Sequence, residues 1–78
     1  MTMRLPILKH TLVQGQHVRS YKILPVPNAG WLASEERDSG VVMHRHYTDW
    51  HRVERIASRF RNEIAALHRN GWVEIPAA

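Results

Sequence analysis

Apolar residues recur at every third or fourth position from Thr48 to Gly71, and this spacing predicts one amphipathic α-helix over residues 48–71. Successive helical residues lie about 100° apart around the axis, so the apolar side chains fall in one arc, which must face a core. Thr48 or Asp49 is expected to cap the amino end, and Asn70 with Gly71 to end the helix. The arc holds Trp50 at its margin, Val53, Ile56, Ala57, Phe60, Ile64 and Leu67.

Short apolar runs separated by turn signals precede the helix, which is the pattern of an antiparallel meander. Pro6 predicts that the first strand is short or absent, and Pro25 with Pro27 predicts that the second lies at an edge of the sheet or ends early. Strand alternation places Val41, Met43, Arg45 and Tyr47 on one face of the fourth strand. The expected strands are Leu5–Val13, His17–Val26, Trp31–Arg37 and Val41–Tyr47, with a short final strand over Trp72–Ile75.

These elements predict an α+β fold: an antiparallel sheet of three to five strands, followed by one long C-terminal amphipathic helix that packs on one face. The 78 residues are expected to form a single small domain, in which residues 1–15 are either flexible or an edge strand. A domain of this size has a small core, so each large apolar residue counts. We expect the core to consist mainly of Trp31, Phe60, Ile64, Leu67 and Trp72, surrounded by Tyr21, Ile23, Leu32, Val41, Met43 and Ile56.

The composition is basic and lacks cysteine. The formal charge is +4, the isoelectric point is about 10.4, and nine of the eleven cationic residues are arginine. A basic balance favours acidic partners such as nucleic acid or an acidic protein surface, although a coding bias of the source genome accounts for the arginine content equally well. The lack of cysteine excludes a disulfide framework and thiolate metal sites, and with no signal-peptide or membrane-spanning stretch it predicts a cytoplasmic, non-membrane protein.

Arginine gathers on the solvent side of the predicted helix. Clustered cations neutralise phosphates and release counterions, which gives an affinity that is independent of sequence and falls with salt. The leading hypothesis is a binding surface for nucleic acid or another acidic partner; the simpler explanation is an ordinary solvated helix face. The predicted surface comprises Arg45, Arg52, Arg55, Arg59 and Arg69, with Lys9, Arg19 and Lys22 from the early strands as further candidates.

The layout over residues 21–67, a hairpin with a Gly30-Trp31 step, a further strand and then a helix, resembles the arm-type DNA-binding domains of phage integrases. The resemblance implies a domain that presents its sheet to DNA. The chain departs from that pattern, because the central hairpin carries Glu35, Glu36 and Asp38 where such domains have a basic strand. These acids would repel phosphate, so the helix or the opposite sheet edge is the surface expected to touch DNA.

Histidines near the helix start raise two further hypotheses. His44 and His46 lie two residues apart on one strand and His51 begins the helix, which makes a conceivable metal-ligand set whose spacing matches no standard zinc motif. His44, Arg45, His46 and Tyr47 are also residue types that small toxin-like ribonucleases use. No catalytic signature accompanies them, so no catalytic residue, cofactor or enzymatic activity is predicted.

Contact with another protein is the remaining alternative. Tyr47 and Trp50 are the aromatic candidates for such a contact. The small size suits an accessory or inhibitor protein of a phage or another mobile element, and a small core would gain stability in a homodimer. As a whole, the sequence predicts a small non-enzymatic binding module whose arginine-rich helix face contacts nucleic acid or a nucleoprotein complex.

Overall fold

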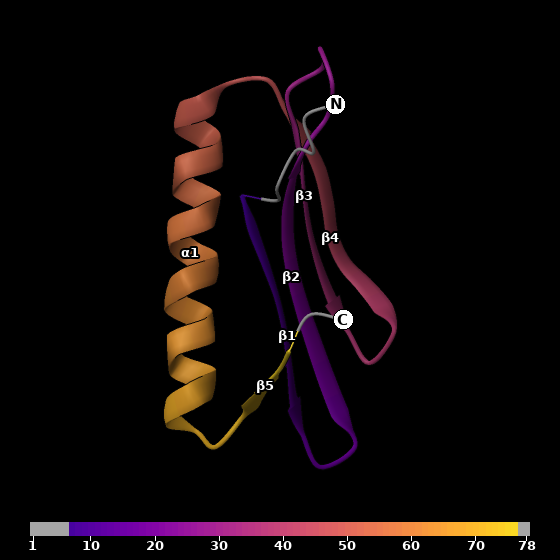
Figure 1. The fold of residues 1–78 in the computed structure, drawn as a ribbon, viewed down its shortest axis with the longest axis vertical. Helices are drawn as coiled ribbons and strands as arrows, with labels where there is room; N and C mark the ends of the chain where they lie inside the picture. The colour runs from indigo at the N-terminus through magenta and orange to yellow at the C-terminus, as the bar shows by residue number, and fades with distance from the viewer. Residues whose placement is uncertain (1–6, 77–78) are drawn as a thin grey trace.

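Five strands form one antiparallel sheet in a computed structural model, which describes residues 7–76 (Figure 1). The strands are β1 (Leu8–Gln14), β2 (His17–Pro25), β3 (Trp31–Arg37), β4 (Gly40–Tyr47) and β5 (Val73–Ile75), and the helix α1 (Trp50–Arg69) joins β4 to β5. Their order across the sheet is β4-β3-β2-β1-β5, so β4 and β5 form the two edges. The expected α+β fold, a meander followed by one C-terminal helix and a short last strand, is confirmed.

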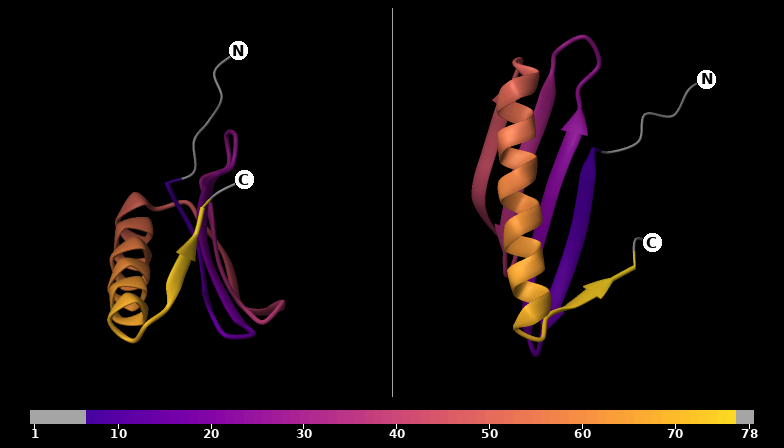
Figure 2. Two further views of the ribbon diagram at one scale, coloured as in Figure 1. Left: turned by 60° about the horizontal axis from the view of Figure 1, so that its bottom comes forward. Right: turned by 90° about the vertical axis from the view of Figure 1, so that its left-hand side faces the viewer.

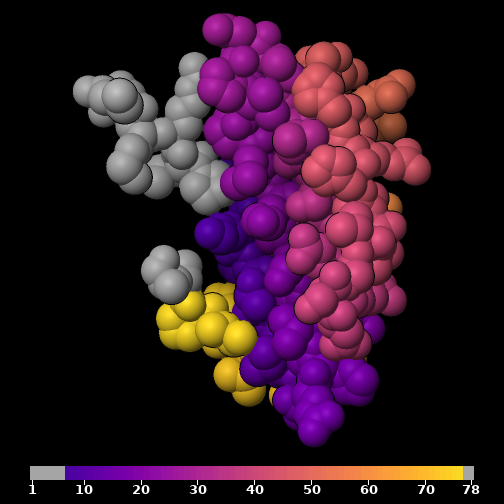
Figure 3. All heavy atoms as spheres, turned by 90° about the vertical axis from the view of Figure 1, so that its right-hand side faces the viewer, coloured from indigo at the N-terminus to yellow at the C-terminus, as the bar shows by residue number. Residues whose placement is uncertain are grey.

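The protein has two layers, because α1 lies along one face of the sheet (Figure 2). We call this side of the sheet the helix face; it carries Leu8, Leu12, Tyr21, Ile23 and Ala33, which are all buried. The alternate residues of the same strands point to the other side, which we call the open face. Figure 3 looks onto the open face and shows atoms of the strands across it, with α1 behind them.

The hydrophobic core lies between α1 and the helix face of the sheet. The rings of Tyr21 and Phe60 meet edge to face with their centroids 5.1 Å apart, and both side chains are fully buried. The predicted core residues Phe60, Ile64 and Leu67 are buried, whereas Trp31 and Trp72 are only partly buried and pack around the core. The hydrophobic pattern did not single out three further buried residues, which are Leu8, Leu12 and Ala33.

Both ends of α1 have the capping groups that the sequence predicts. The Asp49 side chain accepts a hydrogen bond of 3.0 Å from the backbone N–H of His51, which satisfies one free donor of the first turn. At the other end Gly71 has a φ of +89°, its N–H donates to His68, and the N–H of Trp72 donates to the carbonyl of Leu67 at 3.0 Å. These two bonds form a Schellman motif, which turns the chain back towards β5.

β1 lies inside the sheet, between β2 and β5. The prediction that residues 1–15 are flexible or form an edge strand is therefore wrong for residues 8–14. The edge of β1 that faces away from β2 is paired with the three residues of β5. β2 is likewise an inner strand and ends at Pro25, after which the N–H of Val26 donates to the carbonyl of Gly30 across the turn at 2.8 Å. Residues 1–6, including the expected strand start at Leu5, lie outside the described residues.

Two predicted core residues, Leu32 and Val41, lie on the open face of the sheet instead. Leu32 alternates with the buried Ala33 and pairs with His46, so it is half-buried on the open face. Val41 is displaced by an irregularity in β4. The β3–β4 register pairs Met43 with Glu35 but Val41 with Glu36, so Val42 is an extra residue opposite the join between Glu35 and Glu36. Such a bulge reverses the alternation beyond it. Val41 therefore lies on the open face with 65% of its surface exposed, while Met43 remains on the helix face.

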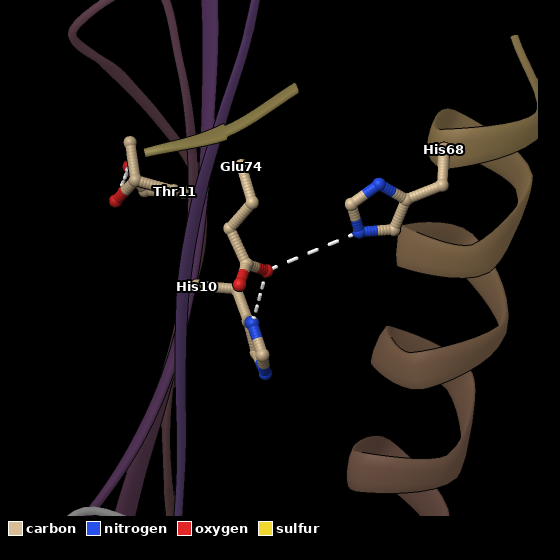
Figure 4. A network of polar contacts seen from close by, with 5 residues as sticks. His10, Thr11, His68 and Glu74 are labelled. Carbon is tan, nitrogen blue, oxygen red and sulfur yellow. Dashed lines mark hydrogen bonds and ion pairs between the residues drawn. The ribbon is translucent and has the colours of Figure 1, made fainter. Parts of the chain in front are cut away.

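The Glu74 side chain of the short strand β5 contacts residues of both β1 and α1 (Figure 4). His10 Nδ1, from β1, donates a hydrogen bond of 2.5 Å to Glu74 Oε1. His68 Nε2, from α1, lies 4.0 Å from the same oxygen, as the dashed lines in Figure 4 show. One carboxylate thus links three elements, which helps a strand of three residues to stay paired.

The turn between β3 and β4 depends on Asp38. Asp38 and Ser39 have φ values of +49° and +70°, as the two central residues of a type I′ hairpin turn require. Asp38 Oδ1 accepts from the backbone N–H of Val18 at 2.9 Å, and Oδ2 accepts from His17 Nδ1 at 3.1 Å. The hydrogen bond from Val18, and after it the one from His17, lower the pKa of Asp38 below its ordinary 3.8.

We expect the contribution of Asp38 to stability to disappear in acid. A carboxyl whose pKa is lowered in the folded state stabilises the fold above its unfolded pKa, and that stabilisation is lost as pH falls through the lower folded value. Asn tolerates the positive φ and can still accept from Val18, so Asp38→Asn removes mainly the charge. Urea unfolding of both proteins should show a gap in stability at pH near 6 that closes below about pH 3.8. A gap that stays constant would contradict the assignment.

Candidate nucleic-acid interface

Four arginines and one tyrosine line an open groove of about 370 Å³ between the edge strand β4 and the flank of α1. The strand supplies Arg45 and Tyr47, and the helix supplies Arg52, Arg55 and Arg59. Ile56, a buried residue of α1, also lines it. We call this feature the arginine groove. It brings together four of the five arginines that the sequence singled out.

Local periodicity explains how these side chains converge. Arg45 and Tyr47 are two residues apart, so they share the helix face of β4 with Met43. Arg52, Arg55 and Arg59 follow a spacing of three and then four residues, which aligns them along one flank of α1. Only Thr48 and Asp49 separate β4 from α1, and this short connection keeps the arginine side of α1 next to β4. The two sets of cations therefore face a shared channel.

Most of the positive charge in the arginine groove is not neutralised within the protein. Arg59 Nε lies 3.7 Å from Glu63 Oε1, and Arg59 Nη2 donates to Met43 Sδ at 3.5 Å. Within residues 7–76, the other three arginines of the groove have no carboxylate oxygen within 4.0 Å. Guanidinium groups in this state present free planar donors that suit phosphate or carboxylate oxygens.

The position of these cations works against the stability of α1. The first turn of the helix contains no acid and carries His51 and Arg52, although the dipole of a helix favours negative charge there. Arg55 and Arg59 are also four residues apart, a spacing at which like charges cost roughly 0.2–0.5 kcal/mol. An acidic ligand in the groove would relieve both effects.

Arg69 and Trp50 lie apart from the arginine groove. Arg69 ends α1 ten residues beyond Arg59, or about 15 Å along the axis. Trp50 packs on Trp31 with ring centroids 5.2 Å apart, and its indole N–H donates to Glu54 Oε1 at 2.8 Å. Trp50 keeps 42% of its surface exposed, beside a cleft on the other flank of the helix. Of the two predicted protein-contact residues, Tyr47 alone belongs to the groove.

The three histidines of the proposed metal set do not converge. His44 and His46 are exposed on the open face of β4, and His46 Nε2 donates to the carbonyl of Ala29. His51 is exposed on α1, on the other side of the sheet, where it lies 4.0 Å from Glu54. Across residues 7–76, no three His, Cys, Asp or Glu side chains are grouped so that they could hold a metal ion.

A buried polar cluster lies under α1, next to the arginine groove. Glu35 is only 3% exposed and accepts from Arg37 Nε at 3.0 Å. The Tyr21 hydroxyl and Glu63 Oε2 are buried without a hydrogen-bond partner among residues 7–76. Burial raises the pKa of Tyr21 above its usual 10.0, and the carboxylates of Glu63 and Glu35 raise it further, against the opposing effect of Arg19. Tyr21 is therefore neutral at physiological pH.

Arg19 and Lys22, which were further candidates, also lie outside the arginine groove. The guanidinium of Arg19 stacks over the ring of Trp72, 5.1 Å from its centroid. Lys22 belongs to the open face, because its neighbours Tyr21 and Ile23 are buried on the helix face.

Comparison with known proteins adds no information on function: no family model, no curated protein and no solved structure matches the chain. Among residues 7–76, no helix combines the length with the apolar character that crossing a membrane requires.

Proposed function

We propose that the protein is a non-enzymatic module that binds nucleic acid through the arginine groove. The observation that supports this is the convergence of Arg45, Arg52, Arg55 and Arg59 on one open channel, with only Arg59 beside a carboxylate in the described residues. Clustered guanidinium groups bind successive phosphates and release the counterions condensed on them. The formal charge of +4 adds a favourable long-range attraction.

Tyr47 favours nucleic acid over an acidic protein surface as the ligand. It is half-buried, packs partly against the core, and lines the groove together with Arg45 from its own strand and Arg52 from the helix. An aromatic ring next to a basic channel provides a surface on which a base can stack, whatever its sequence. Trp50, the other aromatic candidate for a protein contact, lies on the other flank of α1 and does not line this groove.

The experiment compares two double variants with the same change in charge on the same helix. Arg52→Gln with Arg55→Gln removes two cations from the groove, and Arg61→Gln with Arg69→Gln removes two exposed cations outside it. Glutamine has almost the helix propensity of arginine, so both variants should fold. Binding to labelled oligonucleotides is followed by fluorescence anisotropy over a series of salt concentrations.

We expect the groove variant to bind roughly tenfold more weakly, a loss of about 1.4 kcal/mol. The slope of log affinity against log salt should fall by about 1.4 to 1.8, because each lost phosphate contact removes 0.7 to 0.9. The matched variant should change both quantities much less. Equal effects from the two variants would mean that net charge alone drives binding. No binding by the unmodified protein would overturn the proposal, and binding to an acidic protein alone would replace it.

A further inference from the structure

The open face of the sheet carries a second row of polar and cationic side chains. Strand register places Lys9 directly opposite Lys22, Lys22 opposite Ser34, and Ser34 opposite His44. These four residues lie on β1, β2, β3 and β4 in turn, so they form a straight line across four strands. Neighbouring strands are about 4.8 Å apart, which makes the row about 14 Å long. We call it the lysine row.

The lysine row is unfavourable for the sheet alone. Side chains in directly opposed positions have Cβ atoms about 5 Å apart, and like charges in such a pair destabilise a sheet. Lys22 is half-buried, which limits how far water can screen it. Neither lysine has a carboxylate oxygen within 4.0 Å in residues 7–76. Among strands β1 to β4, Glu36 is the one acidic residue on the open face, and it lies opposite Ser20 rather than opposite a lysine. The two lysines of the row, like three arginines of the arginine groove, therefore carry charge that no carboxylate in residues 7–76 neutralises.

The edge strand β4 connects the lysine row to the arginine groove. Its residues alternate between the two faces: His44 and His46 lie on the open face, whereas Arg45 and Tyr47 face the groove. The outer edge of β4 is not paired with another described strand. Polar side chains thus continue from one side of the sheet to the other around a single strand. Figure 3 shows β4 along one border of the open face, with part of α1 visible behind it.

The geometry points to a single-stranded nucleic acid that passes around the edge of β4, with its phosphates in the arginine groove on one side and on the lysine row on the other. This inference rests on the proposed function and defines its ligand. The two surfaces lie on opposite faces of a sheet that is only about 10 Å thick with its side chains, and the lysines lie two and three strands inward from β4. A duplex with a persistence length of about 150 base pairs cannot bend around such an edge, whereas a single strand can.

The test uses Lys9→Thr with Lys22→Thr, since threonine suits a strand and the change removes the repulsion between the lysines. The probes are a long labelled oligothymidine, an oligothymidine too short to reach beyond the groove, and a duplex. We expect the double variant to bind the long strand roughly tenfold more weakly, with a salt slope lower by about 1.4, and to bind the short strand as the unmodified protein does. Thermal unfolding should show that its stability is not reduced.

The outcomes separate this inference from the proposed function. If the lysine variant binds the long strand normally while the Arg52 and Arg55 variant does not, the groove acts alone and the inference is wrong. If the duplex binds more tightly than the long single strand, the path around β4 is wrong. If neither variant changes binding, or the unmodified protein binds no probe, the proposed function fails as well. The Arg61 and Arg69 variant, which removes two charges elsewhere, serves as the common control.

Discussion

Replacing Phe60 by alanine is expected to lower the free energy of unfolding by about 3 to 5 kcal/mol. Phe60 is fully buried and is the helical residue whose ring meets Tyr21 edge to face, so its loss leaves a cavity between α1 and the sheet. A chain of 78 residues has a total stability of only about 4 to 12 kcal/mol. The variant should therefore have a much earlier urea transition than the unmodified protein, and at the lower end of this range it is partly unfolded at 25 °C, with weak near-ultraviolet circular dichroism.

Two substitutions in the same helix serve as controls for Phe60. Phe60→Leu keeps most of the apolar volume and should have an intermediate effect. Asn62→Ala changes an exposed position two residues away and should alter stability by no more than about 0.5 kcal/mol. If Phe60→Ala costs less than about 1 kcal/mol, α1 does not pack on the sheet through this ring, and the arginine groove would lose its helical wall.

Gly30→Ala is the second substitution with a large expected effect, about 3 kcal/mol in the free energy of unfolding. Gly30 has a φ of +81°, a left-handed conformation that costs an ordinary residue about 1 to 2 kcal/mol. A Cβ at this position would also overlap the backbone carbonyl oxygen of Tyr47 and come within 3.2 Å of Thr48 Cα. Because both contacts are with backbone, no side-chain rotation can relieve them, and the chain entering α1 must move.

Gly15 is the matched control for Gly30. It has a φ of +60°, and a Cβ there would meet nothing within 4 Å. Gly15→Ala therefore measures the cost of the backbone conformation alone, and the difference between the two variants measures the overlap with Tyr47. Thermal or urea unfolding of both proteins gives this difference directly. If the two substitutions cost the same, the close approach between the β2–β3 loop and the end of β4 is not as tight as the structure indicates.

The arginine groove shows how far a sequence can predict a site of this kind. Arg52, Arg55 and Arg59 were found together because helical periodicity alone aligns them. Arg45 was included from its place on the preceding strand, but its contact with the same channel depends on the path of the chain through Thr48 and Asp49. Arg69 fits the helical pattern as well, and only the axial separation of about 15 Å removes it from the groove. Periodicity gives the angle around an axis and says little about distance along it.

The sequence by itself determined the elements and their order. Alternation and turn residues predict four successive strands, and the spacing of apolar residues, Asp49 and Gly71 predict a helix whose ends lie within two residues of the observed ones. These features depend on local interactions, which the nearest residues in the chain decide.

The tertiary structure alone decided which residues meet across the layers. It placed β1 inside the sheet through three residues of β5, moved Val41 to the open face through one extra residue in β4, and aligned Lys9 with Lys22, Ser34 and His44. Register and strand order depend on contacts between residues distant in the chain, and a shift of one residue reverses the face of a side chain. For that reason the lysine row and the shared wall of the arginine groove are properties of the folded sheet rather than of any segment.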